Sequence, residues 1–180
     1  MCDNKINIYV DMDGVIAEYG FGDSVEEMAA PGYFAGRPVC ANAVEAVRML
    51  DRDPRFNVFI LSAVFADDHS IEEKSGWLRE NGLGSVVSCF VPYGEKKGDY
   101  VEKSGINILV DDFSKNLFDW ESMGPDFYGI KFTNAGNGCK GSWMERGGFT
   151  VSHRMTAEYI YLVISGIAEG LRTASAGSAA

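Results

Sequence analysis

A strand that ends in two carboxylates is the feature that most constrains how this chain can fold. Residues 6–10 alternate between apolar and other side chains, which predicts a strand running into a core. Asp11 and Asp13 follow it, and Gly14 permits the chain to turn sharply away. Parallel α/β sheets carry their functional sites outside the carboxyl ends of their strands. We therefore expect a functional site that uses these two acids.

The rest of the chain alternates between strands and helices. Further strands are expected at residues 56–61, 85–91, 106–110 and 128–132, and helices at 25–30, 42–52, 70–80, 114–121 and 155–171. Capping pairs are expected to open three of these helices, namely Ser24 with Glu27, Asn42 with Glu45, and Ser70 with Glu73. The alternation favours an α/β fold with a mainly parallel five-stranded sheet and helices on both of its faces.

We expect a single domain over residues 1–172, with a small helical cap inserted at residues 18–38. The insert is too short for a second domain and has a suitable length for a lid over the first strand end. Its aromatic side chains could pack the lid against the core or form a stacking surface for a substrate ring. Residues 134–148 are glycine-rich and expected to be irregular, and the sequence does not indicate what they do. Residues 173–180 are expected to be disordered.

The net charge limits the possible binding partners, and the cysteines indicate the cellular compartment. The formal net charge is −10, which argues against binding to a nucleic-acid polymer or an anionic membrane. A small anionic substrate is compatible with this charge if a metal or a local lysine reverses the field. The four cysteines are widely spaced, which predicts free thiols in a reducing compartment. Because we find no signal sequence and no apolar stretch long enough to cross a bilayer, we expect a cytoplasmic protein. The sequence does not indicate the oligomeric state.

Polar and charged side chains also follow the other predicted strands. Ser62 ends the second strand, Lys96 and Lys97 follow the third, and Asp111 and Asp112 follow the fourth. In a parallel sheet these strand ends converge on one edge. Carboxylates crowded there repel each other unless a positive charge lies between them.

This set of side chains suits phosphoryl transfer. Oxygen ligands without thiolates favour Mg²⁺, which usually takes one or two carboxylates, waters and a substrate phosphate. The metal and a lysine would neutralise a phosphoryl group, and a serine hydroxyl could donate to one of its oxygens. A remaining carboxylate could act as the nucleophile through an aspartyl-phosphate. The two histidines, His69 and His153, lie far apart without metal-ligand spacing.

Four segments together resemble the haloacid dehalogenase (HAD) superfamily of phosphohydrolases. They are DMDGV at residues 11–15, ILS ending at Ser62, the lysine near Lys97, and LVDDFSKN at residues 109–116. The resemblance covers the chain from about residue 6 to residue 132 and implies a Rossmann-like core. The short lid and the DMDGV motif resemble those of the small-capped 5′(3′)-deoxyribonucleotidase branch of this superfamily. Residues 129–134, with Asn137, Gly138 and Trp143, resemble uncharacterised bacterial and phage proteins grouped with that branch.

The resemblance implies a role for each acid. Asp11 would be the nucleophile and a Mg²⁺ ligand. Asp13 would be the general acid and would also lend its backbone carbonyl to the metal. Asp112 would be a direct metal ligand, with Asp111 and Asn116 orienting it.

The resemblance also implies how the phosphoryl group would be bound. Ser62 would bind it and Lys97 would stabilise it, with Lys96 as a close alternative for the lysine. Characterised members have threonine-serine-proline after the second strand, whereas this chain has Ser62-Ala63-Val64. This departure leaves the phosphate-binding hydroxyl and the nucleotide specificity open.

The expected function is that of a Mg²⁺-dependent phosphomonoesterase that works through an aspartyl-phosphate. Its substrate is expected to be a small phosphorylated molecule, most simply a nucleoside monophosphate, as in a 5′-nucleotidase. A phosphatase for another small metabolite, such as a sugar phosphate, is the first alternative. A catalytically silent module that binds a metal and a phosphorylated ligand is the second. Phosphotransfer to an acceptor other than water is disfavoured, because a short lid would not exclude water.

Overall fold

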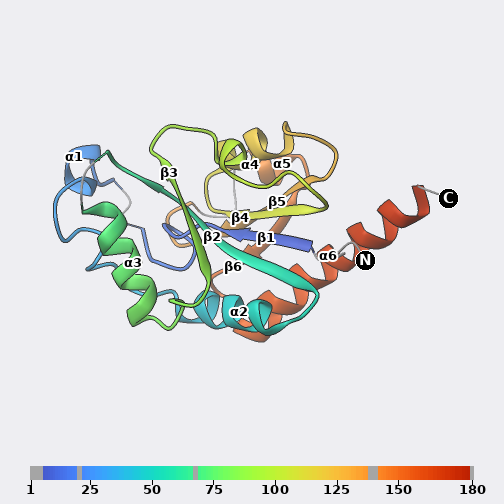
Figure 1. Ribbon diagram of the computed structural model, residues 1–180, viewed down its shortest axis with the longest axis horizontal. Helices are drawn as coiled ribbons and strands as arrows, with labels where there is room; N and C mark the ends of the chain where they lie inside the picture. Colours follow the sequence, from blue (N-terminus) through green and yellow to red (C-terminus); the bar gives the residue numbers. More distant parts are fainter. Residues whose placement is uncertain (1–5, 20–21, 67–68, 138–141, 179–180) are drawn as a thin grey trace.

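A parallel sheet forms the centre of the computed structural model, which describes residues 6–19, 22–66, 69–137 and 142–178. Its strands are β1 (Ile6–Val10), β2 (Phe56–Val64), β3 (Val87–Pro92), β4 (Asn107–Asp111), β5 (Phe127–Thr133) and β6 (Phe149–Ser152). Their spatial order is β3-β2-β1-β4-β5-β6, and every neighbouring pair is parallel (Figure 1). The predicted α/β fold with a parallel sheet is confirmed.

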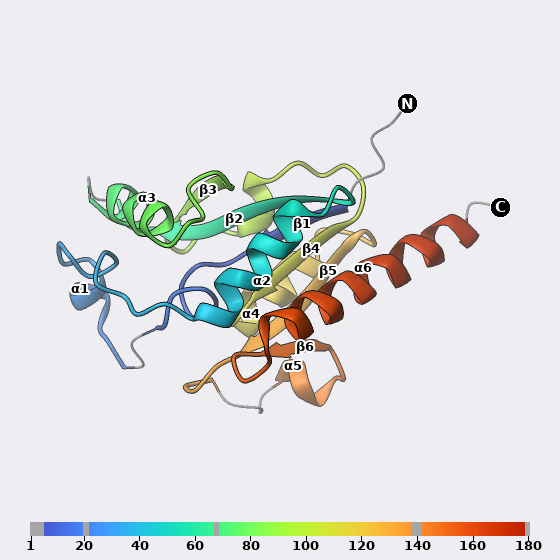
Figure 2. The same ribbon diagram turned by 90° about the horizontal axis from the view of Figure 1, so that it is seen from below.

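Helices cover both faces of the sheet, as predicted. They are α1 (Val25–Met28), α2 (Ala41–Arg52), α3 (Ser70–Glu80), α4 (Ser114–Glu121), α5 (Ser142–Glu145) and α6 (Ala157–Ser178), with a 3₁₀ helix, η1 (Lys97–Tyr100). Figures 1 and 2 show α2 and α6 side by side on one face, with α4 and α5 on the other.

The central strand β1 is buried on both faces. Ile6, Ile8 and Val10 belong to the core shared with α2 and α6. Tyr9 points into the second core, where Trp120 of α4 packs against it edge to face with ring centroids 5.2 Å apart. Because a strand at the middle of a parallel sheet is covered on both faces, all five of its residues are buried.

The sheet has one more strand than the five we expected. Phe149–Ser152 pairs in parallel with β5 as an edge strand, with Phe132 opposite Val151. Its four residues include a single fully buried side chain, Val151, so the apolar pattern of this segment is too short to predict a strand. The predicted irregular stretch 134–148 also contains α5, and its residues 138–141 lie outside the described part of the chain.

One of the three predicted helix caps is confirmed. Ser24 and Glu27 form a complete capping box at α1. The caps predicted at Asn42 and Ser70 are wrong, because both residues already lie within their helices: α2 begins at Ala41 and α3 begins at Ser70 itself. The amide of Asn42 instead donates to the carbonyl oxygen of Met155, which links α2 to the segment before α6.

The C-terminal helix continues where we expected a disordered tail. Helix α6 extends to Ser178, so that expectation is wrong for residues 173–178, and residues 179–180 are not described. Once its first half is packed, adding each alanine-rich residue to the helix costs little. Its far end projects away from the sheet (Figure 2). In the described part of the chain, no helix combines the length and apolarity needed to cross a membrane.

The described cysteines match the prediction of free thiols. Cys40 and Cys89 are both unpaired and partly buried. Cys2 and Cys139 lie outside the described residues.

A charged cluster fastens α6 to the corner between α2 and β2. The guanidinium of Arg55 donates to both carboxylate oxygens of Asp53, and Tyr161 of α6 donates its hydroxyl to Asp53 at 2.8 Å. A second contact joins Arg55 to Glu169 of α6 at 3.1 Å. The hydrogen bonds from Arg55, with a smaller contribution from Tyr161, hold the pKa of Asp53 well below its usual range.

Asp53→Asn should therefore lower the free energy of unfolding by about 1 kcal/mol at about pH 7, since a half-buried carboxylate loses charge-assisted hydrogen bonds that solvent partly screens. The wild-type advantage is full above the unfolded-state pKa of Asp53 and is lost as the pH falls toward the folded-state value. Urea unfolding at about pH 7 and about pH 3 measures both effects. Equal stability of variant and wild type at the higher pH would contradict the assignment.

Candidate active site

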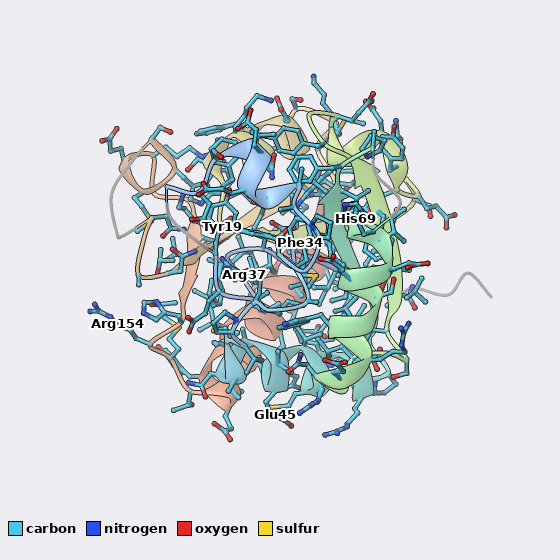
Figure 3. All side chains as sticks on the ribbon, turned by 90° about the vertical axis from the view of Figure 1, so that its left-hand side faces the viewer. Tyr19, Phe34, Arg37, Glu45, His69 and Arg154 are labelled. Carbon is cyan, nitrogen blue, oxygen red and sulfur yellow. The ribbon has the colours of Figure 1, made fainter. Side chains whose placement is uncertain are left out.

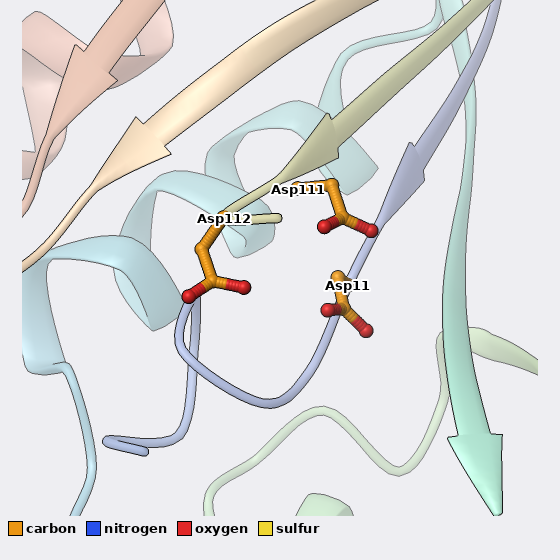
Figure 4. Close-up of side chains that lie close together, drawn as sticks. All are labelled: Asp11, Asp111 and Asp112. Carbon is orange, nitrogen blue, oxygen red and sulfur yellow. The ribbon is translucent and has the colours of Figure 1, made fainter. Parts of the chain in front are cut away.

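The carboxyl ends of β1, β2 and β4 bring the predicted acids to one edge of the sheet. β1 lies between the other two strands, with Val10 in register with Ile60 and with Val110. Asp11 directly follows β1, while Asp111 is the last residue of β4. Figure 4 shows the carboxylates of Asp11, Asp111 and Asp112 turned toward one another beyond the strand ends.

Asp11 is almost fully buried at the centre of this edge. One of its carboxylate oxygens, Oδ1, accepts a hydrogen bond from the backbone N–H of Met12 at 2.8 Å and lies 2.8 Å from Nζ of Lys97. Burial raises the pKa of Asp11 to about 8, and the nearby acids add to the effect, while Lys97 opposes it. The negative charges at this edge are thus only partly compensated by the protein.

Lys97 is the positive charge that reaches this cluster. Its Nζ is 2.7 Å from Oδ2 of Asp111 and 2.8 Å from Oδ1 of Asp11. Burial by itself would lower the pKa of Lys97, but the two carboxylates outweigh it and the net shift is upward. Lys96, the alternative left open by the sequence, is exposed at the start of η1. Lys97 is therefore the lysine that can stabilise charge at Asp11.

Asp111 is fully buried and its oxygens are already engaged. Besides Lys97, it accepts the backbone N–H of Phe113 at 2.8 Å and the amide of Asn116 at 3.0 and 3.2 Å. We expected Asn116 to orient Asp112, but its amide donates to both carboxylate oxygens of Asp111 instead. Asp111 therefore serves to fix Lys97 and the start of α4 rather than to offer a free oxygen.

Asp112 is held by two asparagines that sequence reasoning did not assign to the site. The amide of Asn134 donates to Oδ2 of Asp112 at 3.0 Å and to the carbonyl oxygen of Gly14 at 2.8 Å. The amide of Asn137 donates to the backbone carbonyl of Asp112 at 3.1 Å. Together they join the loop after β5 to the loops after β1 and β4. The segment around them was singled out only by its resemblance to other proteins.

Gly14 is required by the same packing. Its φ of 81° is in the left-handed region, and an added Cβ would lie 2.3 Å from Oδ2 of Asp112. Burial, and then the neighbouring Asp111, raise the pKa of Asp112 to about 7. This carboxylate is thus enclosed by backbone and amide groups and, like Asp11, lacks a full counter-charge.

A second buried lysine, Lys74 of α3, holds Asp13 and Ser62. Its Nζ is 2.5 Å from Oδ2 of Asp13, 2.9 Å from the hydroxyl oxygen of Ser62 and 2.6 Å from the carbonyl oxygen of Ala63. The lysine side chain is completely buried. Ser62 also lies 3.4 Å from Oδ2 of Asp13, so these three side chains form one connected group.

Sequence reasoning did not predict Lys74, although a signal was present. The residue lies on the apolar face of α3, at helical spacing with the buried Trp77 and Leu78. A charged residue on a core-facing stripe is rare unless it has a buried partner. That partner, Asp13, is 61 residues away along the chain and could not be identified without the tertiary structure.

The cap insert at residues 18–38 is fastened to the same helix. The carboxylate of Glu73 accepts the backbone N–H groups of Gly32 at 2.6 Å and Phe34 at 3.1 Å. The ring of Phe34 covers Lys74, with Nζ 4.1 Å from the ring centroid. Figure 3 shows Phe34, Tyr19 and Arg37 near one another on the same side of the molecule.

The acid cluster has the donors that a divalent cation needs. Asp11, Asp111 and Asp112 each offer an oxygen, and these oxygens all lie within 4.8 Å of one another. Because Asp111 is engaged by Lys97 and Asn116, the oxygens best able to bind a cation belong to Asp11 and Asp112. An all-oxygen donor set with uncompensated charge fits Mg²⁺. The carboxylate of Asp13 is paired with Lys74 and is not part of this cluster.

No protein-family model and no curated protein sequence matches the chain. The chain is similar to the solved structure of the HAD domain of effector protein Lem4 from Legionella pneumophila, at 13% sequence identity and a TM-score of 0.46. The match covers 89% of this chain and 94% of that chain.

Replacing Asn134 tests whether the loop after β5 orients Asp112. Asn134→Ala should weaken Mg²⁺ binding about 10–100-fold, since groups that orient a metal ligand typically contribute this much. Calorimetric titration with Mg²⁺ measures the change. Asn81→Ala is the matched control, because the amide of Asn81 bonds the carbonyl of Trp77 at the end of α3. An unchanged affinity in folded Asn134→Ala would contradict the role.

Proposed function

We propose that this chain is a phosphomonoester hydrolase of the HAD superfamily that acts through an aspartyl-phosphate. The observation that carries this proposal is the pairing of two nearby acids with two different buried lysines. Asp11 lies against Lys97, and Asp13 lies against Lys74. This separation supports different tasks for two carboxylates that are only two residues apart.

In the proposed reaction, a carboxylate oxygen of Asp11 attacks phosphorus and the bond from phosphorus to the alcohol oxygen breaks. Asp13 donates a proton to the departing alkoxide. Water then attacks the phosphorus of the aspartyl-phosphate, Asp13 accepts a proton from it, and inorganic phosphate leaves with Asp11 restored. Lys97 compensates the charge that remains on the buried group throughout.

The ion pair between Lys74 and Asp13 bears directly on the acid step. In the ligand-free protein, the ammonium group lies 2.5 Å from Oδ2 of Asp13 and holds this carboxylate in an ion pair. Phosphoryl oxygens arriving beside Ser62 would compete for the same ammonium group, since Lys74 also contacts the Ser62 hydroxyl. Substrate binding would thereby free the carboxylate of Asp13 from Lys74. Lys74 is thus proposed as a second phosphate-binding lysine beside Lys97.

Mg²⁺ fits the site as the proposed cofactor. Bound there, it would neutralise charge on the phosphoryl group and on the acids. Asp11 and Asp112 would hold it, with Asn134 fixing the orientation of Asp112. Asp111 would keep Lys97 in place and would not need to bind the metal itself.

Nucleoside monophosphates are the proposed substrates, because a row of aromatic side chains begins at Phe34, which covers Lys74, and continues to the exposed Tyr93. The ring centroids of Phe34 and Phe65 are 6.2 Å apart, and those of Phe65 and Tyr93 are 4.8 Å apart. The pKa of Tyr19 is raised by burial first, and then by the nearby Asp13 and Tyr93. Tyr19 therefore lies near these two side chains. Tyr93 is 56% exposed and could stack on a base without rearranging the core.

Asp11→Asn should lower Mg²⁺-dependent phosphate release from an aryl phosphate by about a thousandfold or more, because the amide cannot form the covalent intermediate. A colorimetric phosphate assay measures this loss. Asp126→Asn, which changes an exposed carboxylate before β5, controls for the loss of one charge and should keep its activity. Turnover by Asp11→Asn at the wild-type rate would overturn the mechanism.

Tyr93→Ala separates the nucleotide assignment from the sugar-phosphate alternative. Stacking contributes about 1–3 kcal/mol per base, so the variant should raise KM for nucleoside monophosphates about tenfold. It should leave KM for glycerol phosphate unchanged, since that substrate has no ring. Tyr159→Ala on α6 is the control for loss of an exposed tyrosine. Equal changes for both substrates would favour the phosphatase of another small metabolite.

A further inference from the structure

The outward face of α6 is apolar although it is open to solvent. Ile160 and Ile164 belong to the core, and Figure 2 shows the helix along the outside of the molecule. On its other side, Tyr159 is 55% exposed and Leu162 is 59% exposed. Residues 159–168 include no charged side chain. A helix that is apolar on all sides is usually buried by a partner, which makes this face a candidate interface.

Two glycines continue the same face toward the C-terminal end of the helix. Gly166 and Gly170 follow Leu162 at helical spacing, and both are exposed. A Cβ added to either would have no neighbour within 4 Å outside the adjacent turns of the helix. The described part of the chain therefore does not require glycine at these positions, and glycine is unfavourable in the interior of a helix. Close approach of another backbone would require it.

This face fits itself when two copies of the helix lie antiparallel. Its N-terminal half carries the large side chains of Tyr159 and Leu162, and its C-terminal half carries the two glycines. A two-fold axis that passes beside Gly166 would place Leu162 of one copy against Gly170 of the other, and the same contact would occur twice. A parallel pair would instead place Leu162 against Leu162 and leave the glycines facing each other.

Charged residues near the two ends of the face favour the same arrangement. Glu158 and Arg172 are both exposed, and they are 14 positions apart, close to four helical turns. They therefore border the same side of the face. In the antiparallel pair, Glu158 of each copy lies about two residues, or about 3 Å along the helix axis, from Arg172 of the other. A parallel pair would place both Glu158 residues at one end and both Arg172 residues at the other.

We propose that the chain forms a two-fold symmetric dimer through the outward face of α6, with the two helices antiparallel. The apolar side chains of each copy pack over the glycines of the other, and Glu158 pairs with Arg172 across the interface. One helix from each copy makes a small interface, so we expect a dissociation constant in the micromolar range. The proposal concerns assembly alone and does not depend on the phosphatase activity.

Self-association of the full chain tests the proposal directly. Sedimentation equilibrium at about 1–100 µM brackets a micromolar dissociation constant, and about 0.15 M salt screens the net charge of −10. Leu162→Glu should weaken dimerisation at least about tenfold, because it would bury a carboxylate against the other helix. Ile71→Glu, at an apolar position of α3 that is 45% exposed, is the matched control and should dimerise like the wild type. A wild type that stays monomeric over this range, or equal dimerisation of Leu162→Glu and the wild type, would overturn the proposal.

Disulfide trapping tests the antiparallel geometry. Gly166→Cys would place a cysteine beside the two-fold axis, close to its counterpart, so mild oxidation should link the two copies. Thr173→Cys is the matched control on the same face: each copy lies seven residues from the axis, so the two cysteines would be about 21 Å apart and should not be linked. Non-reducing electrophoresis measures the linked dimer, and the wild type with its four cysteines gives the background. Efficient linking of Thr173→Cys, which a parallel pair would produce, or only background linking of Gly166→Cys, would exclude the antiparallel dimer.

Discussion

The buried ion pairs of Lys97 are the interaction on which the candidate site depends. The parallel register of β1 and β4 places Asp11 and Asp111 side by side at one edge, where they would repel each other. The ammonium group of Lys97 contacts both carboxylates, and burial makes this compensation strong because little water screens it. Removing it would leave two buried charges unpaired, a loss that usually costs several kcal/mol. The remaining charge on Asp11 and Asp112 is what a metal would neutralise.

A second lysine links the chemistry to the lid. Lys74 contacts Asp13 on one side and lies beneath Phe34 of the lid on the other. One residue earlier on α3, Glu73 accepts the backbone of the lid. One helix therefore positions both the acid and the segment that covers it.

The fold was largely predictable because its signals are local. The apolar runs of β1, β2, β4 and β5 mark buried strands, and helices of ordinary length separate them. The errors occur where local pattern is weak or is overruled by packing. Strand β6 is four residues long, and α6 continues through small residues because its first half is already anchored. Asn42 was predicted as a cap but bonds Met155, a contact 113 residues away in the sequence.

The sequence by itself determined which acids would meet, because carboxylates that follow adjacent parallel strands must converge on one edge. Asp11, Asp111 and Asp112 do meet there, with a lysine that follows the third strand, whereas Asp13, predicted at the same edge, pairs with Lys74 instead. Only the tertiary structure decided which side chains surround them. The choice of Lys97 over Lys96, the pairing of Lys74 with Asp13, and the contact of Asn134 with Asp112 depend on how distant loops and helices pack. The positions of the main strands along the chain follow from local periodicity. These contacts instead join residues up to 86 positions apart (Lys97 and Asp11), and no local pattern reveals them.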